Sequence, residues 1–464
     1  MAEQWSEPGV RLAQQINIPV SPGDLASAVP VFIGWPQRRA TGGPDGVAGG
    51  AGEPGVLHVL GTLDDWPWAT QGEAGALCLY QTVSHYFDNG GAPCYVLAPG
   101  WWESGPAAAQ AQEKGLTDPG ASPAYQTAYQ AVLAEPAITL VALPQLGIVV
   151  DALEGPLPGT QVPPVSGGGS AGVADPHLDV DPDAKAKAKA RRHVALWAGV
   201  LMALQTRRDL FFVFDAPREP RVATACVPLL GEPTALGERG QFAALYGPYL
   251  VSTETGPQRD AVSDQPLPVI VPPSGAVLAL IERTDQESGV WTAPANAPLL
   301  HVLRPEKRET QAQGWFDVSK PSINLIRSFP GRGVRVWGCR TLAADTGSPM
   351  RYVQVRRLMT YIEANLQDIS RFAVFEPNAA LTWFKLEGLI STWLHTLWHE
   401  GGLAGAQAQQ AYQVMVGVGR SMTMADVQLG RMIVKVRVAI LHAAEFIDLS
   451  LVLNVGESQL VAAS

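Results

Sequence analysis

Apolar positions in the first half of the chain alternate between short continuous runs and longer segments with helical spacing. Residues 28–35 form a short apolar run, which predicts a buried strand. Residues 77–87 repeat at helical spacing and stop at Asn89-Gly90-Gly91, residue types at which helices terminate. Further strands are predicted at 94–98, 138–143 and 210–217, and further helices at 125–133 and 194–204. This alternation from 28 to 216 predicts a layered α/β domain with a mainly parallel sheet.

The last third of the chain carries two strong helical patterns. Apolar residues recur at 3.6-residue spacing from Val355 to Ile369, which predicts an amphipathic helix. A second helix is predicted from about Leu381 to His399, ending at Gly401-Gly402, and its apolar residues are Phe384, Leu389, Trp393 and Leu397. Residues 432–441 are predicted to form a strand.

Both ends of the chain carry alternating apolar residues, although chain ends usually fray unless something holds them. The alternating positions are Val10, Leu12, Ile16, Ile18 and Val20 at one end, and Leu449, Leu451, Leu453 and Val455 at the other. A strand at a free end needs a sheet edge to pair with. That edge belongs either to the same chain or to a neighbouring molecule, as in strand addition. The pattern itself is compatible with both.

Composition narrows the possible partners. Charged residues make up 16% of the chain, against about 25% in typical soluble domains, which predicts a surface largely covered by neighbouring subunits. The formal charge of −10 argues against nucleic-acid binding, which needs a basic surface. The one basic run, Lys185–Arg192, is interpreted as a solvated helical face.

Cysteine usage and the absence of targeting signals indicate the compartment. Four separated cysteines without a CxxC pair predict neither a zinc site nor a disulfide framework, but small core residues in a reducing environment: Cys78, Cys94, Cys226 and Cys339. No signal-peptide pattern and no apolar run of 18 residues is found, so we expect cytoplasmic folding without a membrane anchor. Residues 41–55 and 151–183 are rich in Gly or Pro and are expected to form an exposed loop and an insertion.

Candidate catalytic chemistry is sparse. His395 and His399 lie four residues apart on the second predicted helix, but Thr396 occupies the position where a zinc-protease helix has its Glu. Asp215 ends a predicted strand. A catalytic carboxylate can occupy this position, but the preference of Asp for turns explains it equally well. No phosphate-binding loop or nucleophile elbow is present. We therefore predict no catalytic, cofactor or metal site, and keep a metal-dependent hydrolase using these three residues as the alternative hypothesis.

From Gly289 onward the chain resembles the C-terminal region of contractile tail sheath proteins of phages, R-type tailocins and contractile injection systems. The resemblance is carried by the order and spacing of Gly289–Asn296, Ile323–Arg327, Gly333–Leu342, Tyr352–Glu363, Val374–Asn378, Trp383, Gly401–Gly405 and Ala444-Glu445-Phe446. Weaker upstream matches are Pro8-Gly9-Val10, Phe87–Val96, Phe212–Pro217 and Ala276–Asp285. The arm departs from the family pattern at Arg11 and Leu12, and 151–183 is individual to this chain.

The resemblance implies an α/β fold with an α+β inner domain and four parts. Residues 1–22 and 446–464 would be arms that donate strands to neighbouring subunits. Residues 23–320 would form the outer α/β domain, and 321–445 an inner, tube-facing assembly domain whose sheet those arms complete.

The resemblance also implies function. The chain would polymerise as stacked six-fold rings around an inner tube protein, with baseplate and terminator proteins at the ends. It would assemble in the cytoplasm and become part of a phage tail or a released injection particle. Contraction from a metastable extended state would drive the tube through a target envelope without any cofactor. Candidate tube contacts are Arg356, Arg357, Arg371 and Lys385.

Overall fold

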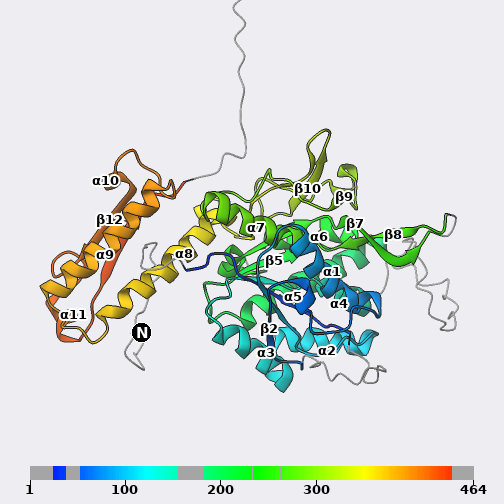
Figure 1. The fold of residues 1–464 in the computed structure, drawn as a ribbon, viewed down its shortest axis with the longest axis horizontal. Coiled ribbons are helices and arrows are strands. Elements are labelled where there is room, and N and C mark those ends of the chain that lie inside the picture. Colours follow the sequence, from blue (N-terminus) through cyan, green and yellow to red (C-terminus); the bar gives the residue numbers. More distant parts are fainter. Residues whose placement is uncertain (1–24, 38–52, 155–180, 233, 261–262, 442–464) are drawn as a thin grey trace, which may run out of the picture.

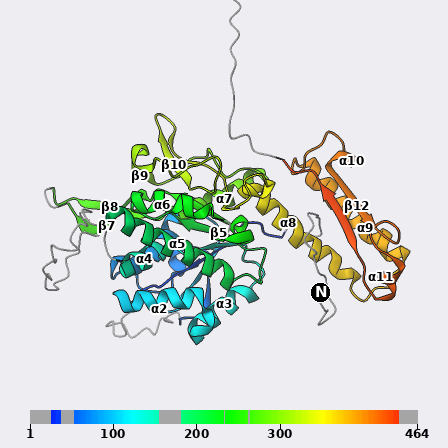
Figure 2. The ribbon, with the colours of Figure 1, turned by 180° about the vertical axis from the view of Figure 1, so that it is seen from behind.

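The computed structural model describes residues 25–37, 53–154, 181–232, 234–260 and 263–441. It shows a large body, built from the chain up to about residue 352, and a smaller lobe beside it (Figures 1 and 2). Helix α8 (Val353–Ser370) runs from the body to the lobe. Both predicted arms and most of the two Gly- or Pro-rich segments lie outside the described residues.

An eight-stranded sheet forms the centre of the body, in the order β11-β10-β6-β5-β4-β1-β3-β2. Six inner strands are parallel, and β11 and β2 close the two edges in antiparallel orientation. The strands are β1 (Pro30–Ile33), β2 (Leu57–Leu60), β3 (Cys94–Leu97), β4 (Leu140–Ala142), β5 (Phe211–Asp215), β6 (Ala243–Gly247), β10 (Asn324–Phe329) and β11 (Gly333–Trp337).

Helices cover both faces of this sheet, because its inner strands are apolar on both sides. Along β5, Phe212 and Phe214 face one core, while Phe211 and Val213 face the other. The first core is covered by α2 (Pro106–Thr117), α3 (Pro123–Ala134), α4 (Leu146–Glu154), α5 (Pro182–Ala203) and α6 (Pro220–Leu230). The second is covered by α1 (Ala74–Asp88) and α7 (Ser274–Ser288). The predicted α/β layer structure is confirmed.

A small antiparallel sheet extends the body, in the order β8-β7-β9. Its strands are β7 (Leu250–Arg259), β8 (Pro266–Val271) and β9 (Val302–Pro305). Short 3-10 turns connect elements of the body and the start of the lobe: η1 (Leu63–Asp65), η2 (Pro119–Ala121), η3 (Gly237–Phe242), η4 (Glu309–Ala312), η5 (Pro349–Arg351) and η6 (Arg371–Ala373).

The lobe packs a two-stranded antiparallel sheet against long helices. Its elements after α8 are α9 (Ala380–His399), α10 (Ala408–Ala411), β12 (Tyr412–Val416), α11 (Met424–Gln428) and β13 (Val434–Val438). Val414, Val416 and Val436 turn inward from the two strands and meet Leu386, Ile390 and Leu394 of α9 in one core.

The structure refines three expectations from the sequence. Strands β10 and β11 continue the large sheet, so the chain leaves the body at α8 and not near residue 320. The basic run lies in α5, but Lys189 is buried and its ammonium group contacts Asp151 at 2.6 Å, so the run is not a fully solvated face. All four cysteines are buried and free, as expected, and burial raises the pKa of Cys78 to about 12.

Candidate assembly surface

Helix α8 is the mechanical link between the body and the lobe, because its two ends belong to different hydrophobic cores. Val353, at its first turn, packs into the body. Leu358, Ile362 and Leu366 pack into the lobe. Because one helix contributes to both cores, α8 fixes the position of the lobe relative to the body.

A buried ion pair fixes the body end of α8. The Arg357 guanidinium contacts the carboxylate of Asp285 on α7, and the two side chains are only 3% and 4% exposed. Arg357 also donates to the carbonyl of Ser27 at 3.0 Å. Ser27 lies two residues after Leu25, where the described part of the chain begins. The start of the described chain is thus held at the junction of body and lobe.

Two of the four predicted tube contacts are not on the surface, which corrects that prediction. Arg357 is held as described above. Arg356 stacks over the Phe242 ring at 4.8 Å and contacts the carboxylate of Glu363 at 3.1 Å. Both guanidinium groups serve contacts within the chain, and Arg356 and Arg357 are not available to a partner in this structure.

The other two candidates do face outward. Arg371 is 75% exposed and pairs with Asp368 at 3.1 Å. Lys385 is exposed on α9, with its ammonium 4.7 Å from the centre of the Phe372 ring. Both lie on the lobe side of α8, and they remain candidates for contact with a partner.

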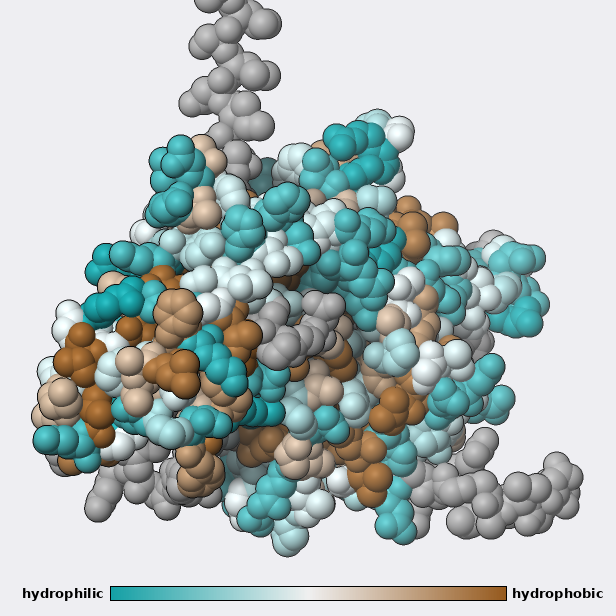
Figure 3. All heavy atoms as spheres, turned by 60° about the vertical axis from the view of Figure 1, so that its left-hand side comes forward, coloured by the Kyte–Doolittle hydropathy of each residue, from teal (hydrophilic) through white to brown (hydrophobic). Residues whose placement is uncertain are grey.

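Helix α9 has a second apolar face that points to solvent. Leu381 is 82% exposed and Phe384 is 79% exposed, and Phe375 in the preceding turn is 87% exposed. Lys385 is the one charged side chain among the exposed positions of α9. Figure 3 brings this side forward and shows apolar side chains gathered on the lobe surface. We call Leu381, Phe384, Lys385 and Leu389 the α9 face.

Of the four apolar residues that the sequence pattern placed on this helix, two are buried and two face solvent; the buried ones are Trp393 and Leu397, and the exposed ones are Phe384 and Leu389. At 100° per residue, Phe384 lies opposite Trp393, which is buried. Helical spacing alone could have separated these two stripes. A cluster of exposed large apolar side chains is typical of a surface that another molecule covers.

The lobe sheet has open edges. Tyr412 of β12 pairs with Val438 of β13, and the ladder runs on to Val416 and Val434. Within the described part of the chain, neither outer edge of this pair is joined by a third strand. Because an isolated strand pair is only marginally stable, α8 and α9 support it from one side. The free backbone groups at its edges are sites where further strands can add.

The structure does not assemble the alternative hydrolase site. His395 and His399 are exposed on α9 in the lobe, whereas Asp215 is half-buried at the end of β5 in the body. Asp215 accepts hydrogen bonds from the backbone N–H and the hydroxyl of Ser274, at 2.7 and 2.8 Å, which anchors the start of α7. Burial raises its pKa to about 7. Among the described residues, no group of three His, Cys, Asp or Glu side chains could hold a metal ion.

The crevice at which parallel α/β sheets bind ligands is filled. Such crevices lie at the carboxyl ends of strands where the chain order reverses, here between β1 and β4. Gln145 follows β4 and is fully buried there. Its amide accepts from the Trp35 N–H at 2.6 Å and donates to the carbonyls of Trp35 and Gly75 at 2.9 and 2.6 Å. The side chain occupies the space a ligand would need, so this crevice offers no small-molecule site.

Comparison with known proteins identifies what this arrangement resembles. Residues 345–454 match the family model described as the phage tail sheath C-terminal domain. The chain is 29% identical to one from the cryo-EM structure of the anti-feeding prophage baseplate in contracted state, with a TM-score of 0.70, covering 98% of this chain and 100% of that one. The chain resembles contractile sheath proteins over its whole length.

Two further similarities agree with this result. A chain from the contracted anti-feeding prophage helical sheath is 26% identical, with a TM-score of 0.63, covering 97% of this chain and 100% of that one. The tail sheath protein of Enterobacteria phage T4 is 30% identical over 115 residues. That match covers 24% of this chain and only 17% of the T4 protein. The sheath resemblance inferred from sequence is confirmed.

No helix among the described residues is both long and apolar enough to cross a lipid bilayer.

Proposed function

We propose that this chain is the structural subunit of a contractile sheath, of a phage tail or an injection particle, and that it is not an enzyme. The observation that carries the proposal is the similarity over nearly the whole length to a chain from a contracted-state assembly. In the assembled form, stacked six-fold rings would surround an inner tube, between a baseplate and a terminator. The sealed body and exposed lobe support this division into a rigid unit and an assembly surface.

Strand addition between subunits would hold the polymer together. Among the described residues the lobe sheet has no third strand at either edge, and Ser27, near the start of the described chain, lies beside α8. At the other end, the described chain leaves the lobe just after β13. Arms that start beside the lobe are well placed to reach the sheet of an adjacent copy. Residues 10–20 and 449–455 would be the donated strands.

Contraction would then need no nucleotide hydrolysis, because the free energy would be stored when the sheath assembles. The extended sheath would be metastable, held by tube and baseplate contacts, and the contracted sheath would bury more surface between subunits. Backbone ladders between neighbours would persist while the bodies rotate about the arms. The α9 face, with Lys385 and the nearby Arg371, would lie against the tube.

Electron microscopy of the purified protein tests the proposal. We expect the full chain, co-expressed with its tube protein, to form hollow tubes with a ringed cross-section. Deletion of residues 1–20 should leave a folded monomer that cannot polymerise. Tubes of normal length from that variant would contradict the arm mechanism.

A single substitution gives a sharper test with a matched control. Leu451→Asp puts a charge on the apolar face of the C-terminal strand and should block assembly. Ser450→Asp adds the same charge on the opposite face and should have a much smaller effect. Equal loss in both variants would indicate a charge effect on the arm in general and not burial of one strand face.

A further inference from the structure

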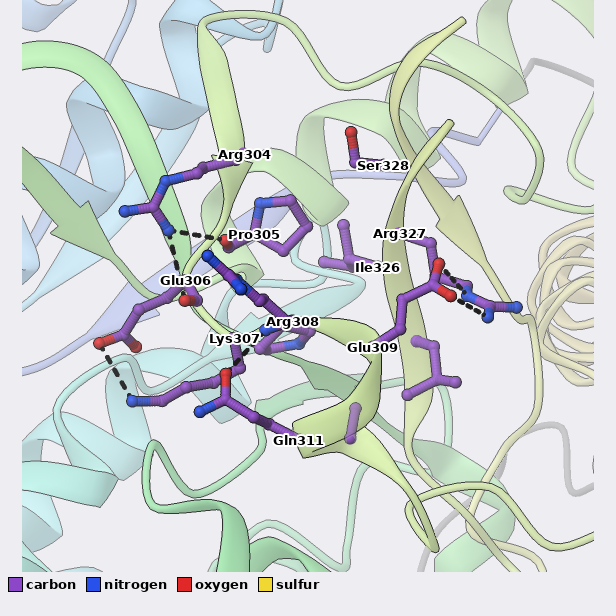
Figure 4. Close-up of a pocket in the computed structure, with 13 residues that line it drawn as sticks. Arg304, Pro305, Glu306, Lys307, Arg308, Glu309, Gln311, Ile326, Arg327 and Ser328 are labelled. Atoms are coloured by element: carbon purple, nitrogen blue, oxygen red, sulfur yellow. Dashed lines mark hydrogen bonds and ion pairs between the residues drawn. The ribbon is translucent and has the colours of Figure 1, made fainter. Parts of the chain in front are cut away.

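A cavity of about 590 Å³ lies on the body, between the segment that follows β9 and strand β10 (Figure 4). The lobe lies at the other side of the molecule (Figure 1). Four cationic side chains line this cavity, Arg304, Lys307, Arg308 and Arg327, against two carboxylates, Glu306 and Glu309. The chain as a whole is strongly acidic, with a formal charge of −10, so this concentration of positive charge is local.

Both carboxylates are already neutralised by cations of the same chain. Glu309 binds the Arg327 guanidinium through two hydrogen bonds, at 2.9 and 2.7 Å. The carboxylate of Glu306 pairs with Arg218, and the Arg218 Nε donates to both carboxylate oxygens, at 2.9 and 3.1 Å. These two carboxylates therefore do not compensate the charge of Arg304 and Arg308.

The remaining two guanidinium groups have no carboxylate among the described residues. Arg304 donates to the carbonyls of Pro305 and Glu306, at 3.2 and 3.3 Å, which orients it at the rim. The Arg308 guanidinium has no hydrogen bond or ion pair with any residue that the structure describes, while its backbone N–H donates to the Gln311 side chain at 2.9 Å. Figure 4 shows Arg308 between the Arg304–Glu306 side and the Glu309–Arg327 pair. The backbone of Arg308 is thus held in place, and its guanidinium is available to bind a ligand.

We propose that this cavity is an oxyanion-binding site, with Arg308 as the main ligand contact and Arg304 as the second. A guanidinium presents paired N–H donors that match the two oxygens of a carboxylate or a phosphate group. The cavity size is in the range of small-molecule sites. The ligand class is thus an anion with two or more acidic oxygens, supplied either as a dissolved phosphate-type ion or as a carboxylate of a neighbouring copy.

Calorimetric titration of the purified chain with inorganic pyrophosphate tests the site, with sodium chloride at equal ionic strength as the reference. We expect saturable binding that Arg308→Ala weakens by about 10- to 100-fold, the effect of losing a charge-assisted hydrogen-bond pair. Arg308→Lys, which keeps the charge but not the paired donors, should fall between. Arg221→Ala removes an exposed arginine on α6 and should bind like the original chain.

Absence of saturable binding would overturn the proposal, and so would unchanged binding by Arg308→Ala. Arg308 is exposed, so its variants are expected to fold, which urea unfolding verifies. Assembly in the presence of pyrophosphate then separates the two sources. Inhibition beyond that of chloride identifies a neighbour's carboxylate as the natural ligand. Unaffected assembly with retained binding identifies a dissolved anion. Since the titration uses the unassembled chain, it does not depend on the sheath proposal.

Discussion

The body and the lobe solve the burial of apolar surface in opposite ways. In the body, helices cover both faces of the main sheet, and its two edge strands, β11 and β2, run antiparallel to their neighbours. In the lobe, the described sheet has two strands with free edges, and α9 turns apolar residues to solvent. The main sheet of the body is covered on both faces within one chain, whereas the lobe has the features of a surface completed by other molecules.

This difference teaches where each kind of mutation should act. Changes in the body are expected to affect the free energy of unfolding. Changes on the outer surface of the lobe are expected to affect assembly and to leave folding intact. The junction, where α8 enters both cores, belongs to the first class.

The largest effect on stability is expected at the junction. Arg357→Ala would leave Asp285 as an unpaired buried carboxylate, which costs about 3–5 kcal/mol of unfolding free energy. Arg371→Ala removes an exposed arginine from the other end of the same region and should change stability by less than about 0.5 kcal/mol. Urea denaturation measures both. A loss below 1 kcal/mol in Arg357→Ala would mean that this ion pair does not anchor α8.

The next effect concerns the lobe core. Leu394 on α9 is fully buried, so Leu394→Ala leaves a cavity and should cost about 2–5 kcal/mol. If body and lobe unfold as one unit, thermal unfolding will show a single transition shifted to lower temperature. If the lobe unfolds separately, an early transition will appear while the body signal stays unchanged, and α8 would then be a weaker coupling than proposed.

Sequence predicted the body better than the lobe for a physical reason. Strands such as β1 and β5 are apolar on both faces and need no partner to be recognised. On α9, two apolar stripes overlap in sequence, and only the fold shows that Trp393 is inside and Phe384 outside. Arg356 and Arg357 were predicted as tube contacts because they are basic, and a sequence does not show whether a basic side chain is used within its own chain. Asp285 lies 72 residues from Arg357 in sequence, so that pairing required the tertiary structure.

The body and the lobe also differ in the direction in which they shift the pKa of a carboxyl group. In the body, burial raises the pKa of Asp215 to about 7, above its usual value of 3.8. In the lobe, hydrogen bonds from Thr423 lower the pKa of Asp426, whose side chain is 15% exposed. Because the folded state holds the Asp215 proton more tightly than the unfolded state, this group favours folding at low pH. That contribution is lost as the pH rises towards 7.

Asp215→Asn tests this linkage, since asparagine is neutral at every pH and still offers an acceptor to Ser274. The unfolding free energy of the original chain should fall relative to the variant by about 1.4 kcal/mol per pH unit between pH 4 and 7. Above pH 8 the difference should be constant. Urea titrations across this range provide the measurement, and a flat difference throughout would show that Asp215 is ionised in the folded chain.

The smallest effect on stability is expected on the α9 face, and it is the most informative about function. Phe384→Ser removes a side chain that is 79% exposed, so the unfolding free energy should change by less than about 0.5 kcal/mol. If this face lies against the tube, the same change should reduce sheath formation around co-expressed tube protein. Met202→Ser, at a half-exposed apolar position on α5 in the body, is the matched control. Normal sheath formation by Phe384→Ser would remove the α9 face from the tube contact and leave its exposed apolar residues to contacts between sheath subunits.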